Sequence, residues 1–235
     1  MKRCYFLLFL LSLFLAVNAS AQSPVIFRGE NIVIGNHISI LEDPTNKLGL
    51  EDIRKSNAFV PSGFTIPNLP LSSSDFWLKF TAKNESDQEH LILGLEYPML
   101  GTCDLYSITD GKVQKLSYNN VFSKRKYQHQ NFLFDLYIAP GTTEEYYLRV
   151  KSTEQMVLPL TLGTPKVMAE SLASNDLAWG IFIGLILVMI LYNFFIYLSV
   201  KDKSYLYYVF YSLFIGLSST TLSGYTYRFI FPDYP

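Results

Sequence analysis

The side chains in this sequence that could do chemistry are aromatic rings and guanidinium groups rather than a catalytic set. The candidates for ligand contact are Trp77, Tyr106, Tyr118, Arg125, Tyr127 and Tyr147. Aromatic rings stack on the apolar faces of sugar rings, and an arginine holds a carboxylate through two parallel hydrogen bonds. These residues predict a surface that binds a small ligand. The alternative is that Trp77 fills the second face of a sandwich strand and that Lys124-Arg125-Lys126 is a solvated loop.

The spacing of the acidic, histidine and glycine residues does not favour catalysis or metal binding. His37, His90 and His129 are scattered, and no cluster has the spacing of metal ligands. Neither a Gly-x-Ser-x-Gly elbow nor a phosphate-binding glycine pattern occurs. Acidic pairs such as Glu42-Asp43 lie in turn-like sequence, where solvation explains them. We therefore expect no enzymatic activity, no metal and no cofactor in this chain.

The segments that must position the candidate residues have the pattern of short β-strands. From Asp75 the apolar residues alternate with polar ones up to Ala82, which indicates a half-buried strand. Similar runs occur at 32–34, 38–41, 90–97, 105–108, 112–118, 132–138, 146–150 and 157–162. Asp110-Gly111 is a dipeptide favoured in tight hairpins, and a helical turn is expected within 45–57. These strands predict an all-β, jelly-roll-like antiparallel sandwich over residues 22–168.

Residues 1–21 have the pattern of a signal peptide. A basic start is followed by an apolar stretch and by Ala19-Ser20-Ala21, the small-x-small pattern that signal peptidase accepts. We expect cleavage before Gln22; the alternative is an uncleaved anchor. Cys4 would leave with this segment, so Cys103 would be the single cysteine of an exported domain and would lie buried as a free thiol.

Two uncharged stretches follow the expected sandwich, at 177–200 and 204–224, and each predicts a transmembrane helix. Asp176 precedes the first stretch, and Lys201 and Lys203 follow it, so the positive-inside rule places these lysines in the cytoplasm. The β domain then faces outward, in the periplasm or the extracellular space of a bacterial inner membrane. Residues 22–176 carry 14 basic and 18 acidic side chains, which gives no indication of nucleic-acid binding.

Three residues of the first stretch are candidates for helix packing. Gly180 and Gly184 lie one helical turn apart and would let a neighbouring helix approach closely. Asn193 is the strongly polar side chain inside the stretch, and its amide needs hydrogen-bond partners within hydrocarbon. We therefore expect further helices beside this one.

Two blocks of sequence resemble the bacterial seven-transmembrane receptors with diverse intracellular signalling modules. The membrane block runs from Leu191-Tyr192-Asn193 through Lys201-Asp202-Lys203 to the aromatic start of the next stretch at Tyr205. The exported block is similar to the type 2 extracellular domain of that family through 41–45, 48–53, 75–80, Asn84, 105–106, Arg125 and 147–150.

The resemblance implies a sensor similar to carbohydrate-binding modules, coupled through seven helices to a kinase, a cyclase or another cytoplasmic module. It implies as partners the lipid bilayer, a carbohydrate or other small-molecule ligand, and the remaining receptor helices or a cytoplasmic signalling partner. Two of seven helices are expected here, so we interpret the chain as truncated, with 225–235 starting an extracytoplasmic loop and any output module lying beyond residue 235. Two alternatives stay open: a membrane-tethered carbohydrate-binding or scaffold protein without signalling output, and an enzyme that processes envelope glycans.

Overall fold

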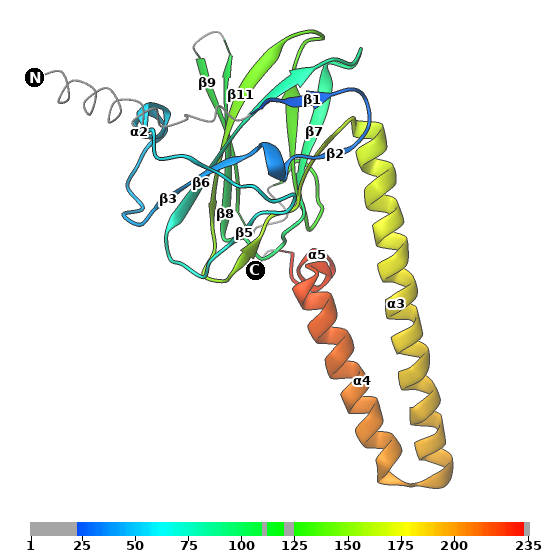
Figure 1. Ribbon diagram of the computed structural model, residues 1–235. Coiled ribbons are helices and arrows are strands. Elements are labelled where there is room, and N and C mark those ends of the chain that lie inside the picture. Colours follow the sequence, from blue (N-terminus) through cyan, green and yellow to red (C-terminus); the bar gives the residue numbers. More distant parts are fainter. Residues whose placement is uncertain (1–22, 110–111, 120–124, 233–235) are drawn as a thin grey trace, which may run out of the picture.

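The computed structural model describes residues 23–109, 112–119 and 125–232. A β-sandwich forms one end of the molecule, and two long helices extend from it to a tight turn at the other end (Figure 1). The predicted signal peptide, the Asp110-Gly111 turn and the last three residues lie outside the described residues. The sandwich and the helices are therefore the parts that can be compared with the sequence expectations.

The elements follow the chain from short strands to long helices. In order they are β1 (Val25–Phe27), β2 (Ile32–Val33), η1 (Gly35–His37), β3 (Ser39–Asp43), α2 (Leu50–Lys55), β4 (Val60–Pro61), β5 (Asn68–Leu69), β6 (Asp75–Asn84), β7 (His90–Leu95), β8 (Thr102–Thr109), β9 (Lys112–Asn119), β10 (Phe132–Tyr137), β11 (Thr143–Lys151), β12 (Met156–Val157), β13 (Leu160–Gly163), α3 (Pro165–Val200), α4 (Lys203–Leu222) and α5 (Tyr225–Phe229).

The larger sheet of the described residues has seven strands, in the order β4-β3-β6-β11-β8-β9 with β1 beside the end of β6. In the middle of the sheet β6 joins β11 in antiparallel register, with Leu78 opposite Leu148. β8 and β9 form the expected hairpin around the Asp110-Gly111 position. The pairing of β1 with β6 is parallel, so antiparallel pairing holds for most of the sheet and not for all of it.

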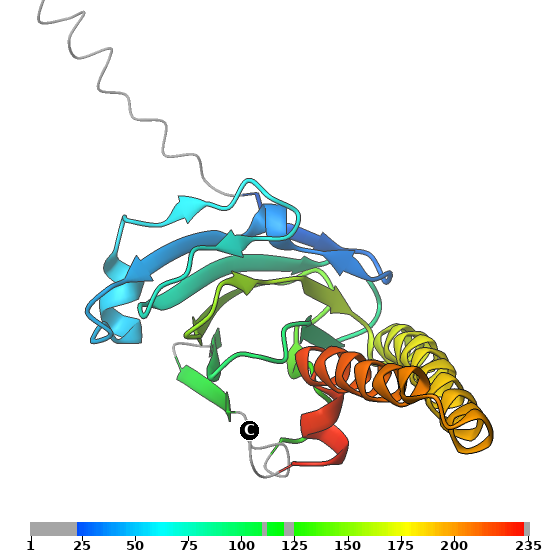
Figure 2. The ribbon, with the colours of Figure 1, turned by 90° about the horizontal axis from the view of Figure 1, so that it is seen from below.

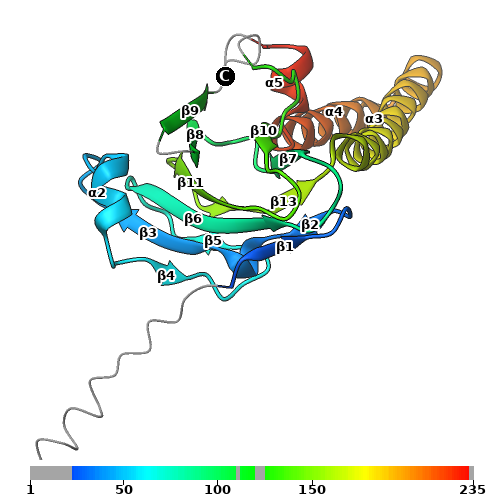
Figure 3. The same cartoon turned by 90° about the horizontal axis from the view of Figure 1, so that it is seen from above.

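The smaller sheet has the order β10-β7-β13-β2 and packs face to face against the larger one (Figures 2 and 3). The main core lies between them and includes Phe76, Leu78 and Phe80 of β6, which are the alternating apolar residues of that strand. Cys103 is buried in this core as a free thiol, and burial raises its pKa well above the ordinary value. The free buried thiol is as expected from the sequence.

A second, smaller core covers the outer face of the larger sheet. It consists of Leu41, Ile53, Trp77, Tyr106 and Tyr147, with Ile53 contributed by the short helix α2. The helical turn expected within 45–57 is this helix. β6 is therefore buried on both faces along the part that α2 covers.

The helix α3 begins well before the apolar stretch that predicted it. Thr164 caps its start by accepting a hydrogen bond from the backbone N–H of Val167, and Pro165 occupies the first turn, where proline is tolerated. Thirty-six residues at 1.5 Å each make a helix of about 54 Å. Its first three turns lie beside the sandwich, and the apolar part extends away from it (Figure 1).

Among the described residues, α3 is the one helix that is long and apolar enough to cross a membrane. The second expected span coincides with α4, which begins where Asp202 accepts a hydrogen bond from the backbone N–H of Ser204. Its tyrosine, serine and threonine residues make it less apolar than α3. A single candidate span is therefore found, and the crossing of α4 stays a prediction.

Candidate functional site

The sandwich meets the helices α3 and α5 at a polar junction, which we take as the candidate functional site. Three segments form it: residues 125–131, which we call the junction loop, the beginning of α3 around Asp176, and α5 with the turn before it. The junction loop leads directly into β10 of the smaller sheet. Any displacement of that sheet edge would therefore reach the helices through this loop.

Arg125 holds the junction loop in shape from inside. Its side chain is 5% exposed, and Nη1 donates to the carbonyl oxygens of His129, at 3.1 Å, and Gln130, at 3.3 Å. The guanidinium carbon lies 4.0 Å from the ring centroid of Phe132, a cation–π distance. Burial lowers the pKa of Arg125 to about 10. This arginine connects the loop to the main core.

Asp135 holds the same loop from the strand side. Its carboxylate accepts hydrogen bonds from the Tyr127 hydroxyl at 2.8 Å and from the Lys126 ammonium at 2.6 Å, and it lies 2.7 Å from Nε2 of His90. Burial acts to raise the pKa of Asp135, but the hydrogen bonds from Lys126, Tyr127 and His90 outweigh it and lower the pKa. The loop is thus fixed to β10 by charged and neutral hydrogen bonds together.

Asp176 and Arg228 form the clamp between the helices and the sandwich. The Asp176 carboxylate accepts from the Tyr225 hydroxyl at 2.6 Å and from Nη1 of Arg228 at 3.0 and 3.2 Å. The same Arg228 nitrogen donates to the side-chain oxygen of Gln130 in the junction loop at 2.9 Å. One arginine therefore joins α3, α5 and the sandwich.

His129 lies next to this clamp with an incomplete set of hydrogen bonds. Its Nδ1 accepts from the backbone N–H of Asn131 at 3.1 Å, and its buried Nε2 has no hydrogen-bond partner, since the nearest Asp176 oxygen is 3.7 Å away. Burial, and then the positive charge of Arg228, lower the pKa of His129 to about 4. The imidazole is therefore neutral at ordinary pH.

The turn between α4 and α5 touches the sandwich closely at Gly224. Its φ of +80° lies in the left-handed region that favours glycine. A Cβ atom placed there would lie 2.6 Å from Cβ of Pro98 and 2.8 Å from Cβ of Gln130. Only a residue without a side chain fits between these two loops of the sandwich.

Apolar contacts reinforce the junction on the α3 side. Met168 packs with Ile92 and Leu133 on the outer face of the smaller sheet, and Tyr127 and Leu172 lie against the same cluster. The start of α3 therefore covers part of that sheet, and the helix cannot shift without disturbing it.

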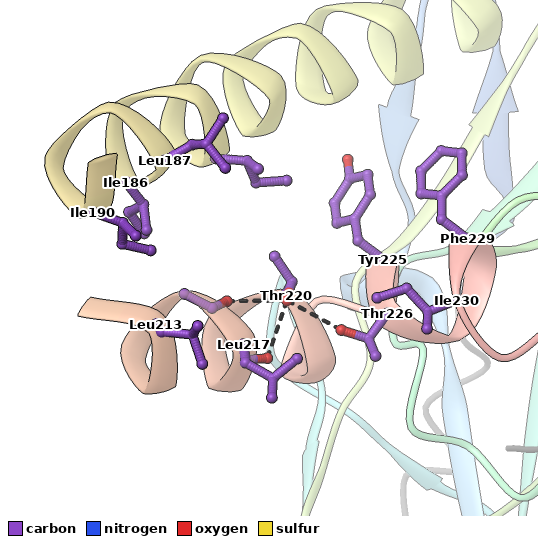
Figure 4. Close-up of a pocket in the computed structure, with 12 residues that line it drawn as sticks. Ile186, Leu187, Ile190, Leu213, Leu217, Thr220, Tyr225, Thr226, Phe229 and Ile230 are labelled. Carbon is purple, nitrogen blue, oxygen red and sulfur yellow. Dashed lines mark hydrogen bonds between the residues drawn. The ribbon is translucent and has the colours of Figure 1, made fainter. Parts of the chain in front are cut away.

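An apolar groove lies between α3 and α4 below the junction (Figure 4). Its volume is about 500 Å³, and at the end nearer the sandwich α5 contributes Tyr225 and Phe229 to the lining. The two helices approach each other within the groove, where a Cβ on Gly216 would lie 3.1 Å from Cγ2 of Ile186. The groove is lined by aliphatic side chains of both helices, as expected of a surface that faces lipid or another helix.

The predicted ligand-contact residues fall into two separate places. Arg125 and Tyr127 belong to the junction loop. Trp77, Tyr106 and Tyr147 gather in the second core beneath α2, where Trp77 and Tyr147 are each 1% exposed. Tyr118 joins the first of these places, because its hydroxyl lies at the backbone of Lys126 in the junction loop; its ring stacks on Phe134 with centroids 4.9 Å apart. They do not form one surface, and their contact with a ligand stays a prediction.

The predicted helix-packing residues also have different surroundings. No atom lies within 4 Å of a Cβ placed on Gly180 or Gly184, so α4 does not approach them, and the close approach is made at Gly216 instead. Asn193 is buried and donates to the backbone carbonyl oxygen of Met189 at 2.8 Å, one turn earlier in its own helix. Packing of the two glycines against further helices stays a prediction.

Sequence reasoning did not find Gln130, Asp176, Gly224 and Arg228 as a site. Asp176 and Arg228 were visible as the charged residues that flank the apolar stretches, which is a signal for membrane topology rather than for pairing. Gln130 and Arg228 lie 98 positions apart, so no local pattern could have joined them. In the described part of the chain, no group of three or more His, Cys, Asp or Glu side chains could hold a metal ion.

Comparison with known proteins gives two family matches. The family described as 7TMR-DISM extracellular 2 matches residues 35–164, and the one described as 7TM diverse intracellular signalling matches residues 175–235. A search of curated proteins gave no significant match. Among solved structures, the chain is similar to a glycoside hydrolase family 43 arabinoxylan arabinofuranohydrolase from Bacillus subtilis in complex with cellotetraose, with a TM-score of 0.29, 10% identity, and coverage of 60% of this chain and 28% of that chain. A likeness at that level carries no argument.

Proposed function

Because this chain belongs to the seven-transmembrane receptors with diverse intracellular signalling modules, we propose that its sandwich senses a small ligand outside the cell membrane and that its helices carry the response inward. A carbohydrate is the first candidate ligand. In this proposal the sandwich is a jelly-roll-like sensor at a bacterial inner membrane, and α4 is a second membrane span. The chain performs no catalytic step, and the output is made by a cytoplasmic module or partner.

The observation that carries the proposal is the clamp at Arg228. Its guanidinium donates to Gln130 of the sandwich and to Asp176 of α3 from a position on α5. A ligand that favours one arrangement of the sandwich over another can shift the helices only through contacts of this kind, because a shift requires differential affinity for two states. The junction offers such contacts at the point where both helices reach the sandwich.

The aromatic residues give the proposal its ligand class. Trp77, Tyr106 and Tyr147 lie together on one face of the larger sheet. Such rings are the usual partners of the apolar faces of sugars, and they contribute stacking that neighbouring polar groups can orient. A carbohydrate is therefore tested before other small ligands.

The proposal is tested with the full chain in lipid nanodiscs and a panel of neutral and acidic tetrasaccharides. Binding is measured by calorimetry, and the response is measured by hydrogen exchange of residues 125–131 and 224–229. We expect at least one saccharide to bind and to change exchange at both segments. In Arg228→Ala the saccharide should still bind, and the change at 224–229 should be lost.

The matched control is Arg28→Ala, because Arg28 also pairs with a carboxylate, Glu85, but is not one of the residues that form the junction. It should retain the wild-type response. Binding without any change at 224–229 in the wild type would favour the tethered binding protein that holds a ligand and transmits nothing. No binding of any saccharide would contradict the carbohydrate-sensing proposal.

A further inference from the structure

The outer face of the larger sheet carries three aromatic rings that belong to the second core. Trp77 of β6 and Tyr106 of β8 have ring centroids 5.4 Å apart, and Tyr147 lies between their strands on β11. Tyr147 meets the ring of Phe59 edge-on at 6.3 Å. In a β-sheet these rings stand perpendicular to the strands, so together they form a wall on that face.

Ion pairs separate the rings on this face. Arg149 donates from Nε to Asp75 at 3.0 Å, Lys79 lies 2.6 Å from Glu145, and Lys115 lies 2.9 Å from Asp104. Each of the three cations also lies over a ring, at 5.3 to 5.7 Å from its centroid. Because every cation here has an acidic partner, the face favours neither a strongly anionic nor a strongly cationic ligand.

Besides these cations, one segment of the chain covers the rings. Residues 44–59, which we call the strap, cross the face and include α2 (Figure 3). The strap places Ile53 fully inside the second core, with Leu48, Leu50 and Phe59 partly buried around it. The strap side chains that pack in this core are all apolar.

Asp43 of β3 fixes the start of the strap, because its carboxylate accepts hydrogen bonds from the hydroxyl and backbone N–H of Thr45 and from the backbone N–H of Leu48. Beyond Leu48, few contacts fix the strap to the sandwich. Ile53 is the single buried residue of α2, whose other side chains include the exposed Glu51, Asp52, Arg54 and Lys55. After it, β4 pairs with β3 over two residues only, and Val60 of β4 is 65% exposed. Segments with few buried apolar contacts open at a lower free energy than the core around them.

The indole nitrogen of Trp77 lacks an acceptor under the strap. Trp77 Nε1 is buried and makes no hydrogen bond, although an indole N–H that leaves water normally finds a partner. Apolar strap side chains complement the rings and leave this donor unused. A ligand with apolar C–H faces would pack on the rings, and its oxygens would accept the hydrogen bond from the Trp77 indole N–H.

We propose that the strap occupies a binding site for a neutral saccharide on the outer face of the larger sheet and leaves it when the saccharide binds. The rings would stack on the sugar, and a sugar oxygen would accept the hydrogen bond from Trp77. Hydroxyl groups of the sugar would form hydrogen bonds with the paired charged side chains around the rings. This inference rests on the proposed sensing function and adds the place of the site and its cover. The strap is then an internal competitor that lowers the apparent affinity for the ligand.

The test uses Trp77 as a reporter, since the chain has two tryptophans and Trp179→Phe leaves only this one. The full chain is placed in nanodiscs, and the probes are cellotetraose and maltotetraose as neutral saccharides and tetragalacturonate as an acidic one. Trp77 fluorescence and its quenching by acrylamide report exposure, and hydrogen exchange reports the strap. We expect a neutral probe to shift Trp77 fluorescence and to speed exchange over residues 44–59.

Two variants separate the strap from the site. Ile53→Ala removes the buried anchor, so the strap should open more often and the neutral probe should bind about tenfold more tightly. Trp77→Phe, measured by calorimetry, removes the N–H donor and should weaken binding about tenfold. Ile34→Ala is the matched control, because Ile34 is equally buried but belongs to the main core. It should lower the melting temperature without changing the affinity.

The outcomes distinguish the inference from the function on which it rests. If a saccharide binds and Ile53→Ala leaves its affinity unchanged, the strap inference is overturned while the sensing function stands. Tighter binding of tetragalacturonate than of both neutral probes would overturn the assignment of a neutral ligand. If no probe binds the wild type or Ile53→Ala, the carbohydrate-sensing function fails, and the inference fails with it.

Discussion

At the scale of single residues, the junction changes the protonation behaviour of His129. Burial beside Arg228 keeps His129 neutral down to its lowered pKa of about 4, and its Nε2 faces Asp176 without reaching hydrogen-bond distance. Protonation of His129 would put a third charge next to an ion pair that joins three segments. The junction is therefore sensitive to acid through this residue.

The pH dependence of stability follows from the lowered pKa of His129. The unfolded chain takes up a proton near pH 6.5, and the folded chain does so only near pH 4, so the unfolded state binds more protons between these values. Stability should fall as the pH is lowered through this range, by at most about 1.4 kcal/mol per pH unit from this group. His129→Gln should reduce that slope in melting curves recorded from pH 7 to pH 4.

The control for this measurement is His37→Gln, because His37 lies in η1 and contacts Ser23 rather than the junction. It should keep the wild-type slope. Equal slopes in wild type and His129→Gln would show that the buried histidine does not contribute to the acid sensitivity.

Among the elements, the turn between α4 and α5 sets how closely the helices approach the sandwich. Gly224 permits this approach, since its backbone is left-handed and the Pro98 and Gln130 side chains leave no room for a Cβ atom. The short helix α5 then presents Tyr225 and Arg228 to Asp176. The clamp depends on this turn as much as on the charged residues.

Gly224→Ala should loosen the junction. Both the left-handed backbone and the contact with Pro98 oppose a methyl group, and together they should cost about 1–3 kcal/mol. Hydrogen exchange of residues 125–131 should become faster as the clamp opens more often. Gly180→Ala is the matched control, because nothing lies within 4 Å of its new methyl group, and it should leave exchange unchanged. Unchanged exchange in Gly224→Ala would contradict the close contact.

In the whole molecule, the sandwich lies at one end of the helices and the turn at Lys201-Asp202-Lys203 lies at the other (Figure 1). Trp179 and Tyr225, with ring centroids 5.4 Å apart, lie near the sandwich end of the helices, where aromatic residues often mark the membrane surface. The chain is a membrane protein with its β domain outside, so the lysine turn should be in the cytoplasm.

Topology can be tested with reporters fused at two positions. A fusion after Lys203 should be active as a cytoplasmic reporter, because both flanking lysines favour that side. A fusion after Arg228 should be active as an exported reporter if α4 crosses the membrane. Cytoplasmic activity at both positions would show that α4 does not cross, and the reverse pattern would contradict the orientation.

Much of the local structure could be predicted because its causes are local. The alternation from Phe76 to Ala82 marks β6, and the Asp110-Gly111 dipeptide lies at the β8–β9 hairpin. The apolar stretch from Leu177 predicted α3 but missed its first three turns. Thr164 and Pro165 start that helix on the sandwich, in sequence that is polar and reads as a connection. The residues that mark the start of a helix, Thr164 followed by Pro165, lie in that sequence.

The sequence by itself determined the strands, the long apolar helix and the family, because periodicity, turn residues and uncharged length depend on neighbours along the chain. Only the tertiary structure decided the site. The side chains of Gln130, Asp176 and Arg228 come from a sandwich loop and two helices. They meet because α4 runs back toward the sandwich and brings α5 beside α3. It also decided that Trp77 lies under a strap while Arg125 supports a loop. Burial and pairing depend on which surfaces fold together, and spacing along a chain does not record that.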